Sequence, residues 1–377
     1  MNDRLIGILG GGQLGRMLAL AGYPLGLRFR FYDPASDAPV RYLAEQVVAS
    51  YDDYLAVTQF GDGLMVATYE FENVPVAMAR ALEQRVPVFP PPQALEVAQD
   101  RLAEKRFFTQ LNIPTAPFAP VDDRASLDAA IARIGLPAVL KTRRLGYDGK
   151  GQMTLRTSAD VDAAWCMLGG QPLILEGFVS FLRELSILAV RGQDDAIACY
   201  PLVENLHRNG ILHRSIAPAP RLAPETQVLA ETYARRVLEA LDYVGVLAIE
   251  LFELDETTAR TTGARLLANE MAPRVHNSGH WTIEGAVTSQ FENHLRAITG
   301  LPLGDTMVRG CAAMVNIIGS LPDVMMLLAL PDTHLHLYDK APRPGRKLGH
   351  VTICADDATH LADRLAIVER YILAGER

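Results

Sequence analysis

Apolar runs separated by turn residues make up the N-terminal part of the chain, and their lengths predict a parallel α/β unit. A buried strand is expected over residues 4–10, then a glycine turn with an amphipathic helix around residues 14–20, then a second strand over residues 28–33. Because such crossovers are right-handed, the two strands should lie parallel in one sheet. Strand-like runs at residues 64–69 and 86–89 continue the pattern, so residues 1–95 are predicted to form a small open α/β domain.

Three consecutive prolines at residues 90–92 interrupt this pattern and predict a domain boundary, because proline fits neither a helix interior nor a sheet centre. A helix is expected over residues 94–111. Strands over residues 136–142 and 152–155 follow it, joined by a loop rich in glycine. The later periodic segments predict strands at residues 173–176, 184–191, 196–201, 246–254 and 264–272, and helices at residues 160–168 and 225–241.

The C-terminal tail, from about residue 301, carries further strand-like pieces and predicts a small β-rich domain. A last helix is expected there, because Leu361, Leu365, Val368 and Ile372 share one helical face.

Composition and charge narrow the classes of protein. The chain has 377 residues, of which 49% are hydrophobic and 21% charged, as in ordinary folded proteins of two or three domains. A net charge of −8 argues against a general electrostatic hold on nucleic acid or anionic lipid. We find no signal segment and no apolar run long enough to cross a bilayer, so a cytoplasmic protein without membrane or nucleic-acid partners is expected. The four cysteines are scattered and favour neither a zinc site nor a redox pair.

The first chemical motif is the glycine turn of residues 10–15, which fits G-x-G-x-x-G between a strand and a helix, with Asp33 ending the next strand. This is the pattern of dinucleotide binding, and it predicts an NAD- or FAD-dependent oxidoreductase. The physical basis is broader, because backbone N–H groups at a helix N-terminus can donate hydrogen bonds to any anion. A sugar phosphate would fit as well as a pyrophosphate.

The second motif is Lys141 on a predicted strand, followed by a loop with Gly146, Gly149 and Gly151. Such a loop can fold its amides over phosphate oxygens while the lysine supplies a positive charge. It is not a Walker A loop, because no G-x-x-x-x-G-K-[ST] is present. The simpler alternative is a flexible hairpin with solvated charges.

The third motif is a set of carboxylates on two successive predicted strands. As an antiparallel pair, these strands would bring Glu250 roughly opposite Glu270, with Asn269 beside it. Facing like charges are destabilising unless a cation joins them, and carboxylate and amide oxygens near phosphate suit Mg²⁺. Alternatively, the two glutamates face opposite sides of the sheet and each meets solvent.

The fourth motif is the polar run of residues 272–281, directly after Glu270. Arg274 is suited to bind an oxyanion, and His276 and Asn277 to orient a substrate. A zinc site at His276 and His280 is disfavoured, since no acidic third ligand lies at a known spacing.

The order of these motifs resembles the ATP-grasp superfamily. More closely, residues 10–17, 68–74, 146–152 and 269–281 resemble the family of N5-carboxyaminoimidazole ribonucleotide synthetases, over residues 4 to about 353. The resemblance implies an α/β and α+β protein with an ATP-grasp fold, an N-terminal Rossmann-like pre-ATP-grasp domain and a small C-terminal β-rich domain. The implied domains are residues 1–95, 96–300 with a lid subdomain at about 136–180, and 301–377.

The resemblance also implies a reaction. ATP phosphorylates bicarbonate to carboxyphosphate, and the amine of 5-aminoimidazole ribonucleotide then takes up the carboxyl group, with release of ADP and phosphate. Glu250 and Glu270 would hold Mg²⁺, and a homodimer is expected because family members are commonly dimers. The implied ATP-binding residues are Arg101, Lys141, Gly146, Tyr147, Asp148, Gly149, Lys150, Gly151, Gln152, Glu176, Gly177, Phe178, Val179, Glu184, His207, Asn269 and Glu270.

The remaining assignments concern the other two substrates. The implied residues of the ribonucleotide site are Gln13, Leu14, Glu70, Asn73, Lys340, Arg346 and Lys347, the last three near the 5′-phosphate. Those implied on the bicarbonate side are Arg274, His276 and Asn277, with Tyr147, Asp148 and Gly149 closing over them.

Two positions depart from the family pattern. Leu145 stands where a second glycine often precedes Gly146, and the turn over residues 255–263 is unusually long. The alternatives kept open are another ATP-grasp ligase, a dinucleotide-dependent oxidoreductase and a non-catalytic nucleotide sensor.

Overall fold

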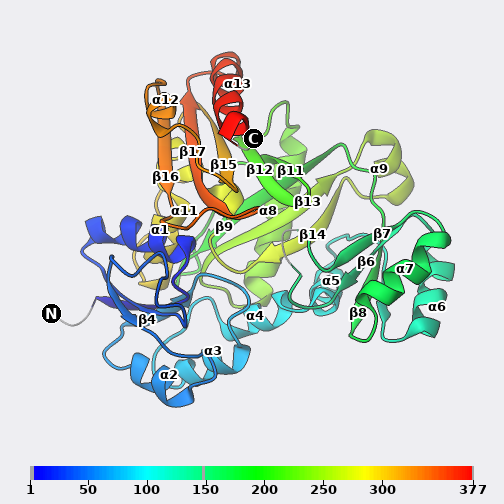
Figure 1. Cartoon of the computed structure of the whole chain (residues 1–377), viewed down its shortest axis with the longest axis horizontal. Coiled ribbons are helices and arrows are strands. Elements are labelled where there is room, and N and C mark those ends of the chain that lie inside the picture. Colours follow the sequence, from blue (N-terminus) through cyan, green and yellow to red (C-terminus); the bar gives the residue numbers. More distant parts are fainter. Residues whose placement is uncertain (1–3, 147–148, 376–377) are drawn as a thin grey trace.

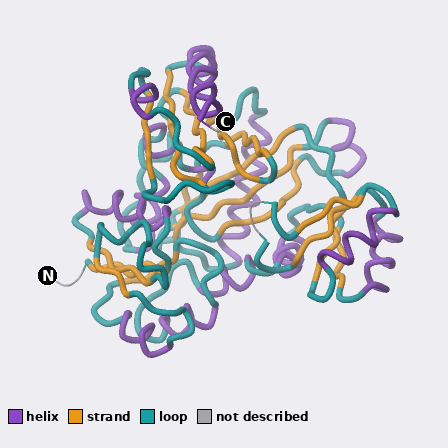
Figure 2. Tube along the Cα trace, viewed as in Figure 1, coloured by secondary structure: helices purple, strands orange, loops and turns teal. Residues whose placement is uncertain are grey.

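The computed structural model describes residues 4–146 and 149–375, in which the strands form three sheets. Figure 1 shows the N-terminal sheet at the lower left, a small subdomain at the right and a large sheet that runs from the centre to the top. Figure 2 shows that helices flank all three sheets. Within the described residues, no helix combines the length and apolar character needed to span a membrane.

The N-terminal sheet is parallel throughout, with strand order β3-β2-β1-β4. Its elements are β1 (Leu5–Leu9), α1 (Gln13–Gly22), η1 (Tyr23–Leu25), β2 (Arg28–Tyr32), β3 (Glu45–Val47), α2 (Tyr54–Phe60), β4 (Val66–Tyr69) and α3 (Val76–Glu83). The predicted parallel unit is therefore confirmed.

One predicted strand of this region is wrong. Residues 86–89 make only a single parallel bridge, between Val88 and Ala67. Pro87 and Pro90 flank this bridge, and a proline cannot donate a backbone hydrogen bond to extend a ladder.

The helix predicted over residues 94–111 is two helices, α4 (Pro92–Ala98) and α5 (Arg101–Gln110). Asp100 divides them, because its side chain accepts hydrogen bonds from the backbone N–H groups of Leu102 and Ala103 and so caps α5. The break places Arg101 at the first position of α5, from which its side chain enters the cleft described below.

The central sheet has nine strands and is antiparallel, with order β14-β13-β9-β11-β12-β15-β17-β16 and β10 paired with β9. Its strands are β9 (Arg183–Arg191), β10 (Ile197–Cys199), β11 (Val203–Arg208), β12 (Ile211–Ala217), β13 (Gly245–Glu253), β14 (Leu266–Ala272), β15 (Cys311–Ile318), β16 (Thr333–Leu337) and β17 (Lys347–Ala355).

In the two helices of this region for which an apolar face was predicted, residues of that face are buried. In α8, Tyr233 and Val237 are buried, and in α13 the four predicted residues at 361, 365, 368 and 372 are all buried. The helices are α8 (Pro224–Ala240), α9 (Glu256–Thr262), η2 (Asn277–Gly279), α10 (Thr282–Gly285), α11 (Gln290–Ile298), α12 (Val324–Leu328) and α13 (Ala358–Gly375).

Two features of the central sheet add detail to the predictions for the turn over residues 255–263 and for the C-terminal strands. The long turn at residues 255–263 contains the short helix α9, capped by Asp255 and ended by Gly263 in a left-handed conformation. The C-terminal strands β15, β17 and β16 continue the central sheet through the pairing of β12 with β15.

The small subdomain contains a four-stranded antiparallel sheet with order β5-β8-β6-β7. Its elements are β5 (Phe118–Val121), α6 (Arg124–Ile134), β6 (Ala138–Thr142), β7 (Gln152–Leu155), α7 (Ala159–Leu168) and β8 (Leu173–Gly177). Helices α6 and α7 lie on one side of this sheet, at the right of Figure 1. Residues 143–146 and 149–151 lie between β6 and β7, where the glycine loop is predicted.

Candidate active site

A cleft of about 620 Å³ lies where the three sheets meet, and most of the predicted site residues line it. The predicted residues in its lining are Gln13, Leu14, Glu70, Asn73, Arg101, Lys141, Gly146, Gly149, Gln152, Phe178, Glu184, His207, Glu250, Asn269, Glu270, Arg274, His276, Asn277 and Lys347. The structure thus brings four separate sequence motifs to one cavity.

The paired carboxylates are the clearest feature of this cleft. Glu250 on β13 stands opposite Glu270 on β14, so the predicted pairing is confirmed. Burial raises the pKa of Glu250 to about 7, and the charge of Glu270 adds to the effect. Burial acts on Glu270 in the same sense, but the ion pair with Arg101 at 3.0 Å outweighs it and lowers the pKa of Glu270. The two carboxylates therefore repel each other in a site that a cation would stabilise.

The ladder between β13 and β14 shifts register beside this pair. Leu251 stands opposite Ala268, so Asn269 is an extra residue without a partner on β13. Two side chains of α5 bind the backbone there: Glu104 accepts the N–H of Met271 at 2.7 Å, and Lys105 donates to the carbonyl of Asn269 at 2.6 Å. Helix α5 therefore fixes the segment that carries Asn269 and Glu270.

Lys141 lies on β6 with its ammonium group 3.0 Å from Glu176 on β8. Lys105 lies 3.5 Å from the same carboxylate oxygen. Although burial acts to raise the pKa of Glu176, the charges of Lys105 and Lys141 lower it to about 2. Glu176 is therefore a buried anion behind Lys141, and Lys141 is the lysine of this cluster that lines the cleft.

Arg101 connects the glycine loop to the carboxylates. Its guanidinium group donates to Glu270 at 3.0 Å and to the backbone carbonyl of Gly146 at 3.1 Å. Leu145, next to Gly146, adopts a left-handed conformation with φ 61°. Such a conformation costs a leucine roughly 1–2 kcal/mol, whereas glycine adopts it freely. This explains why a glycine suits the position where the sequence departs from the family pattern.

The glycine turn after β1 is occupied by carboxylates of the chain itself. Glu70 accepts the backbone N–H of Gly12 at 2.6 Å and that of Gly15 at 2.8 Å, while Asp33 accepts that of Gly11 at 2.7 Å. These amides cannot also bind a pyrophosphate or a sugar phosphate. The dinucleotide interpretation of the turn is therefore wrong, because the anion at this helix N-terminus is Glu70.

Gly12→Ala should disrupt this arrangement, since a Cβ atom at residue 12 would lie 2.3 Å from a carboxylate oxygen of Glu70. We expect a loss of roughly 1–3 kcal/mol in the free energy of unfolding, the scale of overpacking, measured by denaturant titration. In a background with Glu70→Ala the same glycine substitution should cost far less, because the clash partner is gone. Equal losses in both backgrounds would show that this contact does not govern the turn.

Arg274 and Glu72 form an ion pair in the lining of the cleft. The Nε of Arg274 donates to Glu72 at 2.5 Å, and its Nη1 donates to the carbonyl of Val275 at 3.0 Å. Although burial acts to raise the pKa of Glu72, the guanidinium group of Arg274 lowers it to about 2. Glu72 holds Arg274 through its Nε, and among the described residues no hydrogen bond is found for its Nη2 group.

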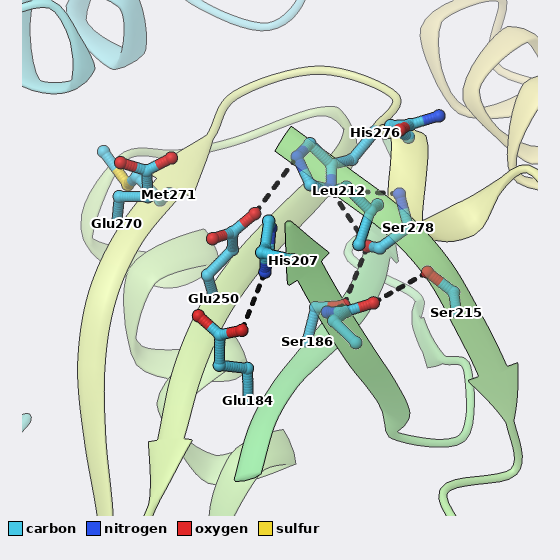
Figure 3. A network of polar contacts seen from close by, with 12 residues as sticks. Glu184, Ser186, His207, Leu212, Ser215, Glu250, Glu270, Met271, His276 and Ser278 are labelled. Atoms are coloured by element: carbon cyan, nitrogen blue, oxygen red, sulfur yellow. Dashed lines mark hydrogen bonds and ion pairs between the residues drawn. The ribbon is translucent and has the colours of Figure 1, made fainter. Parts of the chain in front are cut away.

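His276 lies between Glu250 and Ser278, as Figure 3 shows. Its Nε2 is 3.4 Å from Glu250, and its Nδ1 is 2.9 Å from the hydroxyl of Ser278. Burial, with a contribution from Arg274, lowers the pKa of His276 to about 3, so the ring is neutral at physiological pH. Asn277 exchanges two hydrogen bonds with the side chain of Asn316, at 3.1 and 2.6 Å.

On the same side of the cleft, His207 lies 2.8 Å from Glu184. Although burial acts to lower the pKa of His207, its hydrogen bond to Glu184 and the charge of Glu250 raise it. This histidine therefore carries more positive charge near neutral pH than an isolated imidazole.

Some predicted residues lie outside the lining of the cleft. Lys340 still reaches the site, because it donates a short hydrogen bond to Gln13. Arg346 donates instead to the carbonyl of Ala341 in its own loop. The predicted residues that do not line the cleft are Lys150, Gly151, Glu176, Gly177, Val179, Lys340 and Arg346. Tyr147 and Asp148 lie outside the described residues.

Other residues of the lining were not predicted. Those with charged side chains, Glu72, Glu104 and Arg143, were missed, although Glu72 lies within a segment that the family resemblance includes. Strand β4 ends at Tyr69 and Glu72 lies in the turn that follows, so no strand periodicity in the sequence singles it out. The unpredicted lining residues are Phe71, Glu72, Ala98, Gln99, Glu104, Val139, Arg143, Leu145, Thr154, Gly210, Leu212, Phe252 and Met271.

Carboxylates and amides of the cleft fit a magnesium ion bound together with a phosphate. Among the described residues, no set of three His, Cys, Asp or Glu is arranged to hold a metal ion by itself. Mg²⁺ commonly takes one or two protein carboxylates and completes its shell with phosphate oxygens and water. The repelling pair Glu250 and Glu270 is suited to that arrangement.

Comparison with known proteins gives consistent matches along the chain. A ribonucleotide synthetase preATP-grasp domain matches residues 3–99, an ATP-grasp domain residues 106–291, and a phosphoribosylaminoimidazole carboxylase C-terminal domain residues 312–364. The chain is 55% identical over 370 residues to N5-carboxyaminoimidazole ribonucleotide synthase of Pseudomonas aeruginosa, covering 98% of this chain and 99% of that protein.

Solved structures agree with these matches. The crystal structure of N5-carboxyaminoimidazole ribonucleotide synthetase from Thermus thermophilus superposes with a TM-score of 0.92 at 57% identity, covering 97% of this chain and 98% of that one. The enzyme from Aspergillus clavatus, in complex with ADP and 5-aminoimidazole ribonucleotide, superposes with a TM-score of 0.90 at 31% identity, covering 98% and 99%.

Proposed function

Because the chain belongs to the family of N5-carboxyaminoimidazole ribonucleotide synthases, we propose that its cleft holds ATP, bicarbonate and 5-aminoimidazole ribonucleotide side by side. The chain is an ATP-dependent carbon–nitrogen ligase of purine biosynthesis, which carboxylates the amine of this ribonucleotide and releases ADP and phosphate. The observation that carries the assignment of the cleft is the convergence of Lys141, the pair Glu250 and Glu270, and Arg274 on one cavity.

ATP is assigned to the side of the cleft between the small subdomain and the central sheet. Lys141 supplies a positive charge to the phosphates, and Gly146, Gly149 and Gln152 line the cleft beside it. Arg101 supports this role, because it binds both Gly146 and Glu270 and so couples the loop to the carboxylates. The buried pair of Lys141 and Glu176 orients the lysine.

Mg²⁺ is assigned to Glu250 and Glu270. When bound, this ion neutralises charge on the phosphate oxygens of ATP. Asn269 lies beside the two carboxylates, on the segment that α5 fixes. The repulsion between Glu250 and Glu270 supports the assignment, because it is relieved by a cation.

Bicarbonate is assigned to Arg274, His276 and Asn277. A bicarbonate oxygen attacks the γ-phosphorus to give carboxyphosphate, whose carboxylate charge Arg274 offsets. The ribonucleotide amine then attacks the carboxyl carbon, and phosphate leaves. No side-chain nucleophile is required, so catalysis comes from positioning, charge neutralisation and exclusion of water from the acyl phosphate.

The ribonucleotide is assigned to the N-terminal side of the cleft. Gln13, Leu14, Glu70 and Asn73 line this side, and Lys347 lines it from the C-terminal strands. Lys340 contacts Gln13, so the two chain regions meet there. Burial lowers the pKa of Lys340 to about 8. Because this value is still above 7, most Lys340 side chains carry a positive charge at pH 7 and can bind a phosphate. Arg346 stays a predicted phosphate ligand.

ADP release with single omissions tests this function. Purified protein with ATP and Mg²⁺ should form ADP rapidly only when both bicarbonate and 5-aminoimidazole ribonucleotide are present. ADP formation that ignores the ribonucleotide would overturn the assignment of the acceptor, and ADP formation that ignores bicarbonate would overturn the assignment of the carboxyl donor. A homodimeric state and a cytoplasmic location stay predictions.

A further inference from the structure

The ring of His276 is held by hydrogen bonds that define its tautomer. The backbone N–H of Ser278 lies 3.3 Å from Nδ1 of His276, and the Ser278 hydroxyl lies 2.9 Å from the same nitrogen. A backbone N–H can only donate. Nδ1 must therefore carry the lone pair, and the proton of the neutral ring is on Nε2, the nitrogen that faces Glu250 at 3.4 Å.

A chain of buried polar groups supplies the second donor to Nδ1. Ser186 on β9 donates its hydroxyl hydrogen to the Ser278 oxygen at 2.7 Å, which leaves the Ser278 hydrogen for His276. Asn205 on β11 donates to Ser186 at 2.9 Å, and Ser215 on β12 donates to Asn205 at 2.7 Å. Figure 3 shows these contacts leading from the sheet to His276 and Glu250.

The direction of donation is the same at each step of this chain. Ser186, Ser215 and Ser278 are fully buried, and Asn205 is nearly so. A buried network with all its partners in place is rigid, and its members polarise one another. The chain therefore points one hydrogen after another toward Nδ1, from three neighbouring strands of the central sheet.

The backbone of His276 is fixed as well. Gln290, which is fully buried on α11, accepts the N–H of His276 at 2.9 Å and donates to its carbonyl at 2.7 Å. The ring and the peptide of His276 are thus held independently. Such precise support is typical of a side chain whose orientation matters for chemistry.

We propose that Ser186 and Ser278 are positioning residues. They fix the ring of His276, which is assigned above to bicarbonate, in the tautomer that donates from Nε2–H. The inference rests on the proposed function of the cleft. The inference also excludes one role for His276. The ring does not accept the proton of the ribonucleotide amine, because the lone pair on its Nδ1 points toward Ser278.

The tautomer is tested directly in the unmodified protein. Protein labelled with ¹⁵N-histidine is compared with the His276→Gln variant to identify the His276 signals, and long-range ¹H–¹⁵N correlations then distinguish the tautomers. We expect a protonated Nε2 and an unprotonated Nδ1 near neutral pH. A protonated Nδ1 would overturn the proposal, whatever the variants do.

Kinetics test the positioning role. Ser278→Ala and Ser186→Ala should each lower kcat/KM for bicarbonate by roughly 10–100-fold, the scale for supporting partners of a site residue, with KM for ATP within about 2-fold of wild type. His276→Gln keeps an amide N–H donor that has no tautomer, so it should retain more activity than His276→Ala. For the same reason, Ser278→Ala should cost little more when added to His276→Gln.

Thr352→Val is the matched control. Thr352 is a fully buried hydroxyl on β17 for which the described part of the chain offers no hydrogen-bond partner, so its removal should leave the kinetics unchanged. Wild-type kcat/KM for bicarbonate in Ser278→Ala would overturn the positioning role, as would full multiplicative losses in the double variant. If instead ADP formation never depends on bicarbonate, the proposed function fails, while the spectrum of His276 still reports its tautomer.

Discussion

Glu270→Gln lowers kcat at least ~100-fold while leaving the protein folded, if the paired carboxylates hold the ion that accompanies ATP. The substitution preserves the shape of the side chain and its hydrogen-bonding capacity toward Arg101, but it removes one of two facing charges. Removal of one key electrostatic group from an active site typically lowers kcat by roughly 100-fold or more. The initial rate of ADP formation at saturating ATP, bicarbonate and ribonucleotide measures it.

The thermal midpoint should change little in this variant. The ion pair between Arg101 and Glu270 is weakened, but the repulsion between Glu270 and Glu250 is relieved. A direct binding readout accompanies the kinetics: Mn²⁺ bound in the presence of ADP, followed by its electron spin resonance, should weaken by at least ~10-fold.

Glu256→Gln is the control for this experiment. Glu256 lies on α9, in the connection between the same two strands, with its side chain 91% exposed and 3.5 Å from Arg260. An exposed pair of this kind contributes little, so activity and Mn²⁺ binding should match wild type. Near-normal turnover in Glu270→Gln would contradict the metal assignment.

The sequence predicts those parts of the site that lie on regular strands. Glu250 and Glu270 were placed opposite each other because the period of a strand and the antiparallel pairing leave few alternatives. The position of Lys141 was predictable for the same reason, because it lies on the regular strand β6 next to the glycine loop.

Contacts between distant segments could not be predicted in this way. Lys105 and Glu104 look like ordinary polar residues of a helix, and only the packing of α5 against β14 shows that they bind the backbone of Asn269 and Met271. The register shift that exposes these backbone groups has no signal in the strand pattern.

The glycine turn shows that a short motif can predict local structure without predicting the ligand. The pattern at residues 10–15 correctly indicates a strand, a tight turn and a helix N-terminus. The pattern does not show which anion accepts hydrogen bonds from the backbone amides of the turn. That anion is the carboxylate of Glu70, which lies more than 50 residues later in the sequence. The fold of the motif was predictable, and its ligand was not.

Arg274→Met separates the chemical role of Arg274 from its structural role. The side chain of Arg274 is 13% exposed and pairs at 2.5 Å with that of Glu72, which is 30% exposed. Removing one partner from a fully buried pair costs roughly 3–5 kcal/mol, whereas an exposed pair is worth about 1 kcal/mol or less. For this partly exposed pair we expect a loss of about 2 kcal/mol in the free energy of unfolding, measured by urea titration at pH 7.

Activity should fall further than stability alone explains. Removal of one group that stabilises a developing oxyanion lowers kcat by roughly 100–1,000-fold, and Arg274 is the cationic side chain assigned to the carboxylate of bicarbonate. Bicarbonate-dependent ADP formation, measured at a temperature where the variant is fully folded, gives this loss.

The double variant Glu72→Met with Arg274→Met is the decisive comparison. Replacing both members of a buried pair by apolar side chains is often neutral, because no unpaired charge is left behind. The free energy of unfolding should therefore return to within about 1 kcal/mol of wild type, while turnover stays as low as in Arg274→Met. Recovery of activity together with stability would mean that Arg274 serves only to neutralise Glu72, and the bicarbonate pocket would then have to be placed elsewhere in the cleft.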